Sequence, residues 1–268
     1  WNRFISNNAS YITLRVDQKP FDDVRVRRAL NMAINKPEII KTYYGGNAEL
    51  LGFPMHPSWT GYFEPLNDMP ESVRELYVYN PTKAKALLAE AGYPNGFSFK
   101  AQTAATTLDN DMLSQVAAYL DRVGVKMEIQ VMEYPAFLSA MTTRTNAPGY
   151  YLQAGLNNPT TSLRKTFVTK QTWNPSQHSD PEFDKKMAEV YAKPDERVRQ
   201  IKVKLMVREI LEAFETQRLE RAGDLEPPLV AVGQRARLEP RVARDADVFE
   251  HSTTEAYGAI RVRFGYRW

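Results

Sequence analysis

Two apolar stretches separated by a helical pattern, all within residues 97–132, constrain the fold more than any other part of the sequence. Residues 97–102 and 125–132 favour strands, and residues 108–123 repeat apolar side chains at helical spacing, with Gly124 to end the helix. Two strands joined by a helix of about fifteen residues run parallel, because the helix carries the chain back to the same end of the sheet. The stretch therefore predicts a parallel sheet layer.

The rest of the chain continues this alternation of helices and strands. Arg25, Arg27 and Arg28 are expected to lie off the buried face of the first helix. Residues 47–79 are rich in proline and aromatic residues and are expected to be irregular. The pattern predicts an α/β fold with a mixed, mostly parallel sheet flanked by helices. Further helices are expected at residues 23–34, 37–44, 81–91, 135–145, 181–193 and 195–221, and further strands at 11–16, 150–155, 228–232 and 260–268.

Composition excludes several classes of protein. The 268 residues are 43% hydrophobic and 25% charged, which is ordinary for a soluble globular chain. A net charge of +3, from 35 basic and 32 acidic residues, gives no support for nucleic-acid binding. Cysteine is absent, which excludes disulfides, thiolate metal sites and a cysteine nucleophile. The chain starts at Trp1 without an initiator methionine or a leader-like segment, so we expect an internal piece of a longer protein.

The residue pattern predicts no metal site and no cofactor. No two of the histidines, His56, His178 and His251, can share a helical turn, and we expect them at the surface or in a cleft. Residues 109–111 (DND) resemble the start of a calcium loop but lack its glycine and distal glutamate. The arginines of residues 235–244 alternate with acidic residues, which indicates a solvated surface. No nucleotide-binding glycine pattern occurs.

Residues 162–165 (SLRK) leave an enzymatic alternative open. Ser162 and Lys165 have the Ser-x-x-Lys spacing that places a lysine one helical turn from a serine nucleophile in acyl-transfer enzymes. The Ser-Asp-Asn and Lys-Thr-Gly partners of those enzymes are missing from the chain. We therefore expect that the protein is not an enzyme and keep an acyl-transfer hydrolase as the alternative.

Polar and aromatic residues follow the predicted strands and occur in two irregular segments. In an open parallel sheet, the loops beyond the carboxyl ends of the strands line the ligand crevice. Aromatic surfaces with a few amide and carboxylate groups suit small-molecule binding without covalent chemistry. Several of these residues can instead pack locally, and we expect roughly half to face a ligand. The predicted ligand-binding residues are Met55, His56, Trp59, Gln102, Thr103, Glu133, Tyr134, Leu156, Asn157, Asn158 and Trp173.

Four segments resemble the extracellular solute-binding proteins of family 5, the oligopeptide-, dipeptide- and nickel-binding group of ABC importers. They are residues 19–35 (KPFDDVRVRRALNMAIN), 79–97 (YNPTKAKALLAEAGYPNGF), 179–184 (SDPEFD) and 227–232 (PPLVAV). The resemblance implies a lobe like those of type II periplasmic binding proteins. Residues 1–17 would be a strand of the hinge or first lobe, 18–240 the second, ligand-binding lobe, and 241–268 a return strand to the first lobe. The missing part would be the N-terminal lobe.

The resemblance also implies a function without chemistry. A small organic solute, whether a peptide, a sugar-like molecule or another compound, would bind between the lobes and pass to an ABC permease in the membrane. The protein would be periplasmic or extracellular, with a lipid tether as one form of the full-length protein. Residues 155–159 (GLNNP) lack the Asp with which peptide-binding members pair a peptide's α-ammonium group, and they also lack the Trp of that motif. A third alternative is an interaction module that has lost ligand binding.

Overall fold

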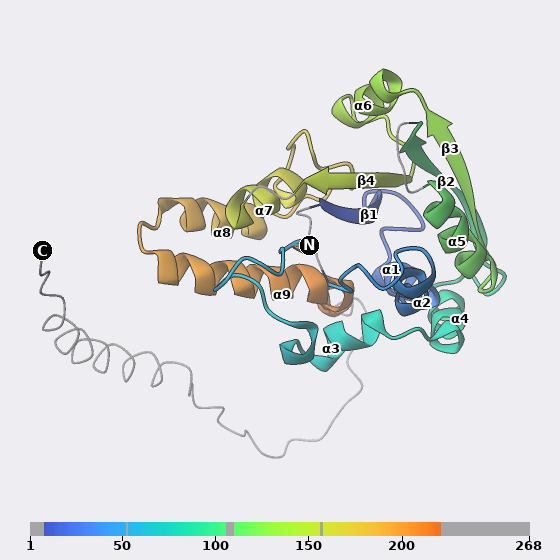
Figure 1. Ribbon diagram of the computed structural model, residues 1–268, viewed down its shortest axis with the longest axis horizontal. Coiled ribbons are helices and arrows are strands. Elements are labelled where there is room, and N and C mark those ends of the chain that lie inside the picture. The colour runs from blue at the N-terminus through green and yellow to red at the C-terminus, as the bar shows by residue number, and fades with distance from the viewer. Residues whose placement is uncertain (1–7, 52, 106–109, 156–157, 221–268) are drawn as a thin grey trace, which may run out of the picture. The chain divides into compact units, whose positions relative to one another are not determined.

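This computed structural model describes residues 8–51, 53–105, 110–155 and 158–220, which include a four-stranded mixed sheet. The strand order is β1-β4-β2-β3 (Figure 1). β2 runs parallel to both β3 and β4, whereas β1 pairs with β4 in the antiparallel direction. The predicted α/β fold is therefore confirmed. The strands are β1 (Asn8–Leu14), β2 (Phe97–Ala104), β3 (Val125–Met132) and β4 (Gly149–Gly155).

The predicted crossover is present, since α5 (Asn110–Asp121) connects the parallel strands β2 and β3. β2 extends two residues beyond its predicted end, because Thr103 and Ala104 pair with Val131 and Met132 of β3. The prediction that Gln102 and Thr103 follow this strand is wrong, since both lie within it. β2 and β3 pair along all eight of their residues, so pairing with β3 decides where β2 ends.

Helices on one side of the sheet form the larger hydrophobic core with it. α1 begins at the N-cap Asp23, whose side chain accepts a hydrogen bond from the backbone N–H of Arg25, and α4 begins at the N-cap Asn80. Val26, Ala29 and Leu30 of α1 are buried as predicted. The helices are α1 (Val24–Ala33), α2 (Lys36–Thr42) and α4 (Pro81–Glu90), which share this core with α5.

The prediction that three arginines lie off the buried face of α1 is wrong for two of them. Arg27 and Arg28 are 8% and 6% exposed. The guanidinium group of Arg27 donates to Phe21 O at 2.7 Å, and that of Arg28 pairs with Glu75. Burial is tolerated because each cation meets hydrogen-bond acceptors.

A second core is built mainly from helices and from residues 51–77. The long helix α9 packs beside α8 (Figure 1), and the ion pairs Lys186–Glu209 and Lys202–Glu189 join the two. The segment predicted to be irregular contains three short helices, which is a correction. The elements are η1 (Leu66–Asp68), α3 (Glu71–Arg74), η2 (Glu75–Tyr77), α7 (Pro159–Phe167), α8 (Pro181–Ala192) and α9 (Glu196–Glu220).

A small third cluster covers the sheet near the end of β2. α6 (Tyr134–Thr142) places Phe137 on Tyr150 of β4, with ring centroids 4.2 Å apart and planes 11° apart. The Tyr150 hydroxyl donates to Phe137 O at 2.6 Å, and burial raises the pKa of this tyrosine. These contacts fix the start of α6 beside the end of β2.

Several predictions fall outside the described residues. They are the strands 228–232 and 260–268 and the domain boundary at residue 241. The structure pairs β1 with β4 in the same sheet as the other strands. The assignment of residues 1–17 to a hinge or first lobe stays a prediction. Among the described residues, none of the helices combines the length and the apolar composition that crossing a bilayer requires.

Candidate ligand-binding site

The carboxyl ends of β2, β3 and β4 point to one edge of the sheet, because the three strands are parallel. This edge, the carboxyl edge, is where ligands bind in open α/β sheets. Among the described residues, Glu133 and Tyr134 follow β3 and Asn158 follows β4 at this edge. Whether they contact a solute stays a prediction.

Two predicted residues are accessible at the end of β3. Glu133 is the N-cap residue of α6, and its exposed carboxylate forms no capping hydrogen bond. Tyr134 is 49% exposed at the first position of α6. Val131 is 54% exposed beside them, and the sequence reasoning missed it because it continues the inward-facing series Val125, Met127, Ile129. Together they present a carboxylate, a phenol ring and an apolar contact.

Asn158 follows β4 and starts α7. Its Oδ1 accepts hydrogen bonds from Thr161 N at 2.8 Å and Thr160 Oγ1 at 3.1 Å. The oxygen thus caps the helix, as the sequence predicts for an asparagine before a proline, and the side chain is exposed. The other two residues predicted to follow β4, Leu156 and Asn157, lie outside the described residues.

Gln102 and Thr103 are buried within β2, at 8% and 0% exposure. The Gln102 amide accepts from Ala147 N at 2.9 Å and donates to Gln130 Oε1 at 3.2 Å. Thr103 Oγ1 donates to Asn110 Oδ1 at 3.2 Å. These hydrogen bonds hold β2 to its neighbours. Both residues therefore pack locally, which is the alternative to facing a ligand.

Met55 and His56 are also buried, at 3% and 4% exposure. His56 Nδ1 lies 2.6 Å from Ser58 Oγ and accepts from Ser58 N at 3.2 Å. The expectation that the histidines lie at the surface or in a cleft is therefore wrong for His56. Trp59 is half-buried, with its ring 6.1 Å from the His56 ring. These three residues lie close together, in the helical core rather than at the carboxyl edge.

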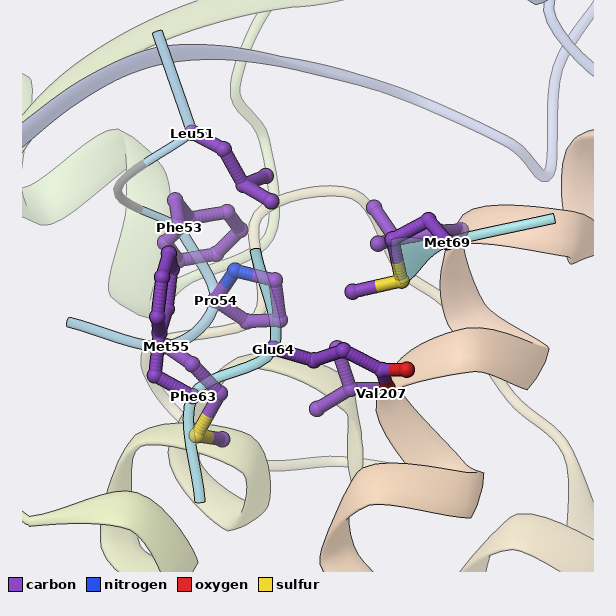
Figure 2. Close-up of a pocket in the computed structure, with 9 residues that line it drawn as sticks. Leu51, Phe53, Pro54, Met55, Phe63, Glu64, Met69 and Val207 are labelled. Carbon is purple, nitrogen blue, oxygen red and sulfur yellow. The ribbon is translucent and has the colours of Figure 1, made fainter. Parts of the chain in front are cut away.

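Figure 2 shows the apolar hollow beside Met55. It encloses about 190 Å³, part of which is open to solvent, and ligand pockets typically reach roughly 300–1,000 Å³. Glu64 at its rim is already bonded to Arg208, whose Nε lies 2.8 Å from Glu64 Oε2. The hollow is too small for an organic solute of ordinary size. Its lining residues are Leu51, Phe53, Pro54, Met55, Phe63, Glu64, Met69, Val207 and Leu211.

Trp173 is 41% exposed, but its loop is held at the other end of β4. Asn146, which lies just before β4, donates from its side chain to Pro175 O at 3.1 Å. Asn174 braces the same loop by donating to Val168 O and His178 O. The structure therefore does not bring Trp173 to the carboxyl edge beside Glu133 and Asn158.

The serine and lysine of the enzymatic alternative lie on α7. Ser162 is fully buried, and its Oγ has no hydrogen-bond partner among the described residues. Burial lowers the pKa of Lys165. A nucleophile must reach its substrate, so the burial of Ser162 argues against acyl transfer. The described residues also include no cluster of three or more His, Asp or Glu side chains that could hold a metal ion.

The chain is similar to a protein family model and to several bacterial binding proteins. The family model "Bacterial extracellular solute-binding proteins, family 5 Middle" matches residues 2–174. Heme-binding protein A of Haemophilus influenzae is 43% identical over 90 residues, which are 34% of this chain and 15% of that protein. Glutathione-binding protein GsiB of Escherichia coli K12 is 37% identical over 124 residues, which are 46% of this chain and 22% of that protein.

Solved structures agree with the family match. The ABC transporter-associated periplasmic binding protein DppA from Helicobacter pylori, in complex with the peptide STSA, gives a TM-score of 0.67 at 28% identity. HbpA2 from Haemophilus parasuis gives 0.66 at 26% identity. The matches cover 77% and 78% of this chain but only 40% and 41% of those chains. The predicted likeness to type II periplasmic binding proteins is confirmed, and the chain belongs to the bacterial extracellular solute-binding proteins of family 5.

Proposed function

We propose that this chain is the ligand-contacting lobe of the substrate-binding component of an ABC importer. It holds a small organic solute without converting it. The family match over residues 2–174 carries the proposal. The exposed groups at the carboxyl edge support it, because a carboxylate, a phenol ring and an amide suit reversible binding by hydrogen bonds and stacking.

The proposed contact surface is made by Glu133, Tyr134 and Asn158, with Val131 beside them. Tyr134 offers a ring for stacking, Glu133 an acceptor, and Asn158 its amide nitrogen, since its oxygen caps α7. Leu156 and Asn157, which precede Asn158 in the sequence, also belong to the proposed surface. Gln102 and Thr103 support this surface from inside the sheet, while Met55, His56, Trp59 and Trp173 belong to the proposed site only if a second lobe reaches them.

The proposed solute is neutral or sugar-like rather than a peptide. The sequence of residues 155–159 (GLNNP) has asparagine where a charged carboxylate would hold a peptide ammonium group. A charge-assisted hydrogen bond is roughly twice as strong as a neutral one. The proposed setting is the periplasm or the cell exterior, with a second lobe closing over the solute and an ABC permease receiving it.

Native mass spectrometry of the full-length protein tests this proposal by detecting a co-purified small molecule. Calorimetry with that molecule should show tight binding by the full-length protein and weak binding by this chain alone, because one lobe holds half of the site. Tyr134→Ala in the full-length protein should weaken binding, whereas Lys85→Glu on the exposed face of α4 should leave it unchanged.

Three results would contradict the proposal. Submicromolar binding by the isolated chain would mean that no second lobe is needed. Labelling of Ser162 by a penicillin-like acylating probe would favour the hydrolase. A full-length gene without an upstream lobe would favour an interaction module.

A further inference from the structure

The outer side of β3 has no strand next to it among the described residues. β2 pairs with its inner side and α5 packs on it, and Figure 1 shows β3 at the rim of the sheet. An edge strand presents unpaired backbone N–H and C=O groups, which makes it a template for another strand. An eight-residue strand is therefore open to pairing.

The side chains of β3 divide into a covered face and an open face. Val125 and Met127 are buried, whereas Lys126, Glu128 and Gln130 are exposed. Lys126 and Glu128 form no hydrogen bond or ion pair with the residues that the structure describes. Opposite charges thus lie two residues apart on one face of an edge strand, and each is available to a partner.

We propose that β3 pairs with β3 of a second copy of this chain, in antiparallel register centred on Met127. A two-fold axis perpendicular to the sheet then places Lys126 of each copy opposite Glu128 of the other. Opposite charges directly across an antiparallel pair stabilise it, and like charges destabilise it. The pairing extends one sheet into the other and does not depend on the proposed solute-binding function.

The charges favour the register centred on Met127 over the registers centred on Glu128 and Ile129. Centring the pair on Glu128 would place the two Glu128 carboxylates opposite each other, and centring it on Ile129 would place Glu128 opposite an uncharged Gln130. Within each copy, Glu128 also lies beside the exposed Lys100 of β2. In the proposed dimer each Glu128 therefore lies between two lysines, one from each copy, and the charges alternate across the joined sheets.

The covered face is compatible with the same register. Val125 of one copy falls opposite Ile129 of the other, and the two Met127 side chains meet at the axis. These residues already face the helical side of the sheet, so the apolar layer continues across the junction. Lys126 and Glu128 also discourage pairing with an uncharged strand, because charged edges resist unselective association. The edge thus fits its own copy better than an arbitrary strand.

Sedimentation velocity over a concentration series of the full chain tests the proposal. Wild-type protein should pass from a species of 30.7 kDa to one of twice that mass. Lys126→Glu and Glu128→Lys each replace two opposite-charge pairs by two like-charge pairs, so each should weaken the dimer on the order of tenfold. An equimolar mixture of the two variants restores both opposite-charge pairs and should form a heterodimer close to wild-type affinity.

The control is Lys85→Glu on the exposed face of α4, which changes the net charge by the same amount as Lys126→Glu and should leave the dimer intact. Circular dichroism of each variant confirms that it is folded. A wild-type chain that stays monomeric at every concentration overturns the proposal. A dimer that neither variant weakens, or variants that fail to associate when mixed, overturns it as well.

Discussion

The guanidinium group of Arg28 lies inside the fold, between α1 and the segment that carries α3 and η2. It pairs with Glu75 and donates to Ser72 O at 3.4 Å, and Glu75 also pairs with Lys83. Arg28→Ala leaves the Glu75 carboxylate, 24% exposed, with Lys83 alone. Removing one partner of a buried pair costs about 3 kcal/mol, and we expect a loss near that size in urea unfolding.

Arg74→Ala is the matched control for this prediction. Arg74 pairs with Glu71, but the two side chains are 46% and 75% exposed. Exposed pairs contribute below about 1 kcal/mol, so this variant should be nearly neutral. Equal losses in the two variants would mean that burial does not decide the strength of the Arg28 pair.

The ionisation of Asp17 should make the free energy of unfolding depend on pH. The hydrogen bond from Arg15 lowers the pKa of this carboxyl, and Arg15 also donates to Arg144 O and Asn146 O. A lowered folded-state pKa contributes stability above the unfolded value of about 3.9 and loses it as pH falls through the folded value. The difference in unfolding free energy between wild type and Asp17→Asn should therefore shrink as pH falls below about 4. Because Asp17 is 40% exposed, the difference at neutral pH should stay below about 1 kcal/mol. A difference that grows on acidification would contradict the assignment.

Asn158 joins two roles at the scale of an element, since it caps α7 and belongs to the proposed contact surface. Asn158→Ala removes the acceptor of Thr161 N–H and should cost about 1 kcal/mol in thermal or urea unfolding. Asn158→Ser keeps a capping oxygen and should retain stability. If the serine variant is stable but binds solute weakly in the full-length protein, the amide nitrogen contacts the solute. If both variants are as stable as wild type, the cap is not needed.

Local patterns were sufficient to predict the elements that begin with a capping residue. Asp23, Asn80 and Asp180 each accept backbone N–H groups at the start of a helix whose apolar repeat is visible in the sequence. The end of β2 was not predictable in this way, because pairing with β3 extends it through Ala104. Nor was the burial of Arg28, since its partner Glu75 is 47 residues away.

The candidate site shows the same difference between features set by local sequence and features set by distant segments. Glu133 and Tyr134 could be predicted because they directly follow an apolar strand, and the structure places both in the open. Gln102, Met55 and His56 are also of residue types that suit ligand binding, but their burial depends on segments distant in sequence. Sequence patterns therefore identify residues that follow a strand, as at β3, but they do not identify which side chains remain accessible.

At the scale of the whole molecule, the described residues belong to one compact unit with two large cores. Leu113 lies in the core beside the sheet and Leu163 in the helical core, and they are 1% and 0% exposed. Each Leu→Ala change should cost about 2–5 kcal/mol. Both should shift one transition, seen at the same urea concentration by circular dichroism and by tryptophan fluorescence. Separate transitions in either variant would show that the two cores unfold independently.

The antiparallel pairing of β1 with β4 has a consequence for synthesis of the chain. Thr13 Oγ1 donates to Tyr150 O, a contact across 137 residues, and ribosomes add roughly 5–20 residues per second. β1 is therefore synthesised roughly 7 to 27 seconds before its neighbour. During that interval its apolar residues, such as Ile12 and Leu14, remain without the strand that later shields them. Nascent chains arrested before residue 149 should thus be the form of this protein that chaperones hold most strongly.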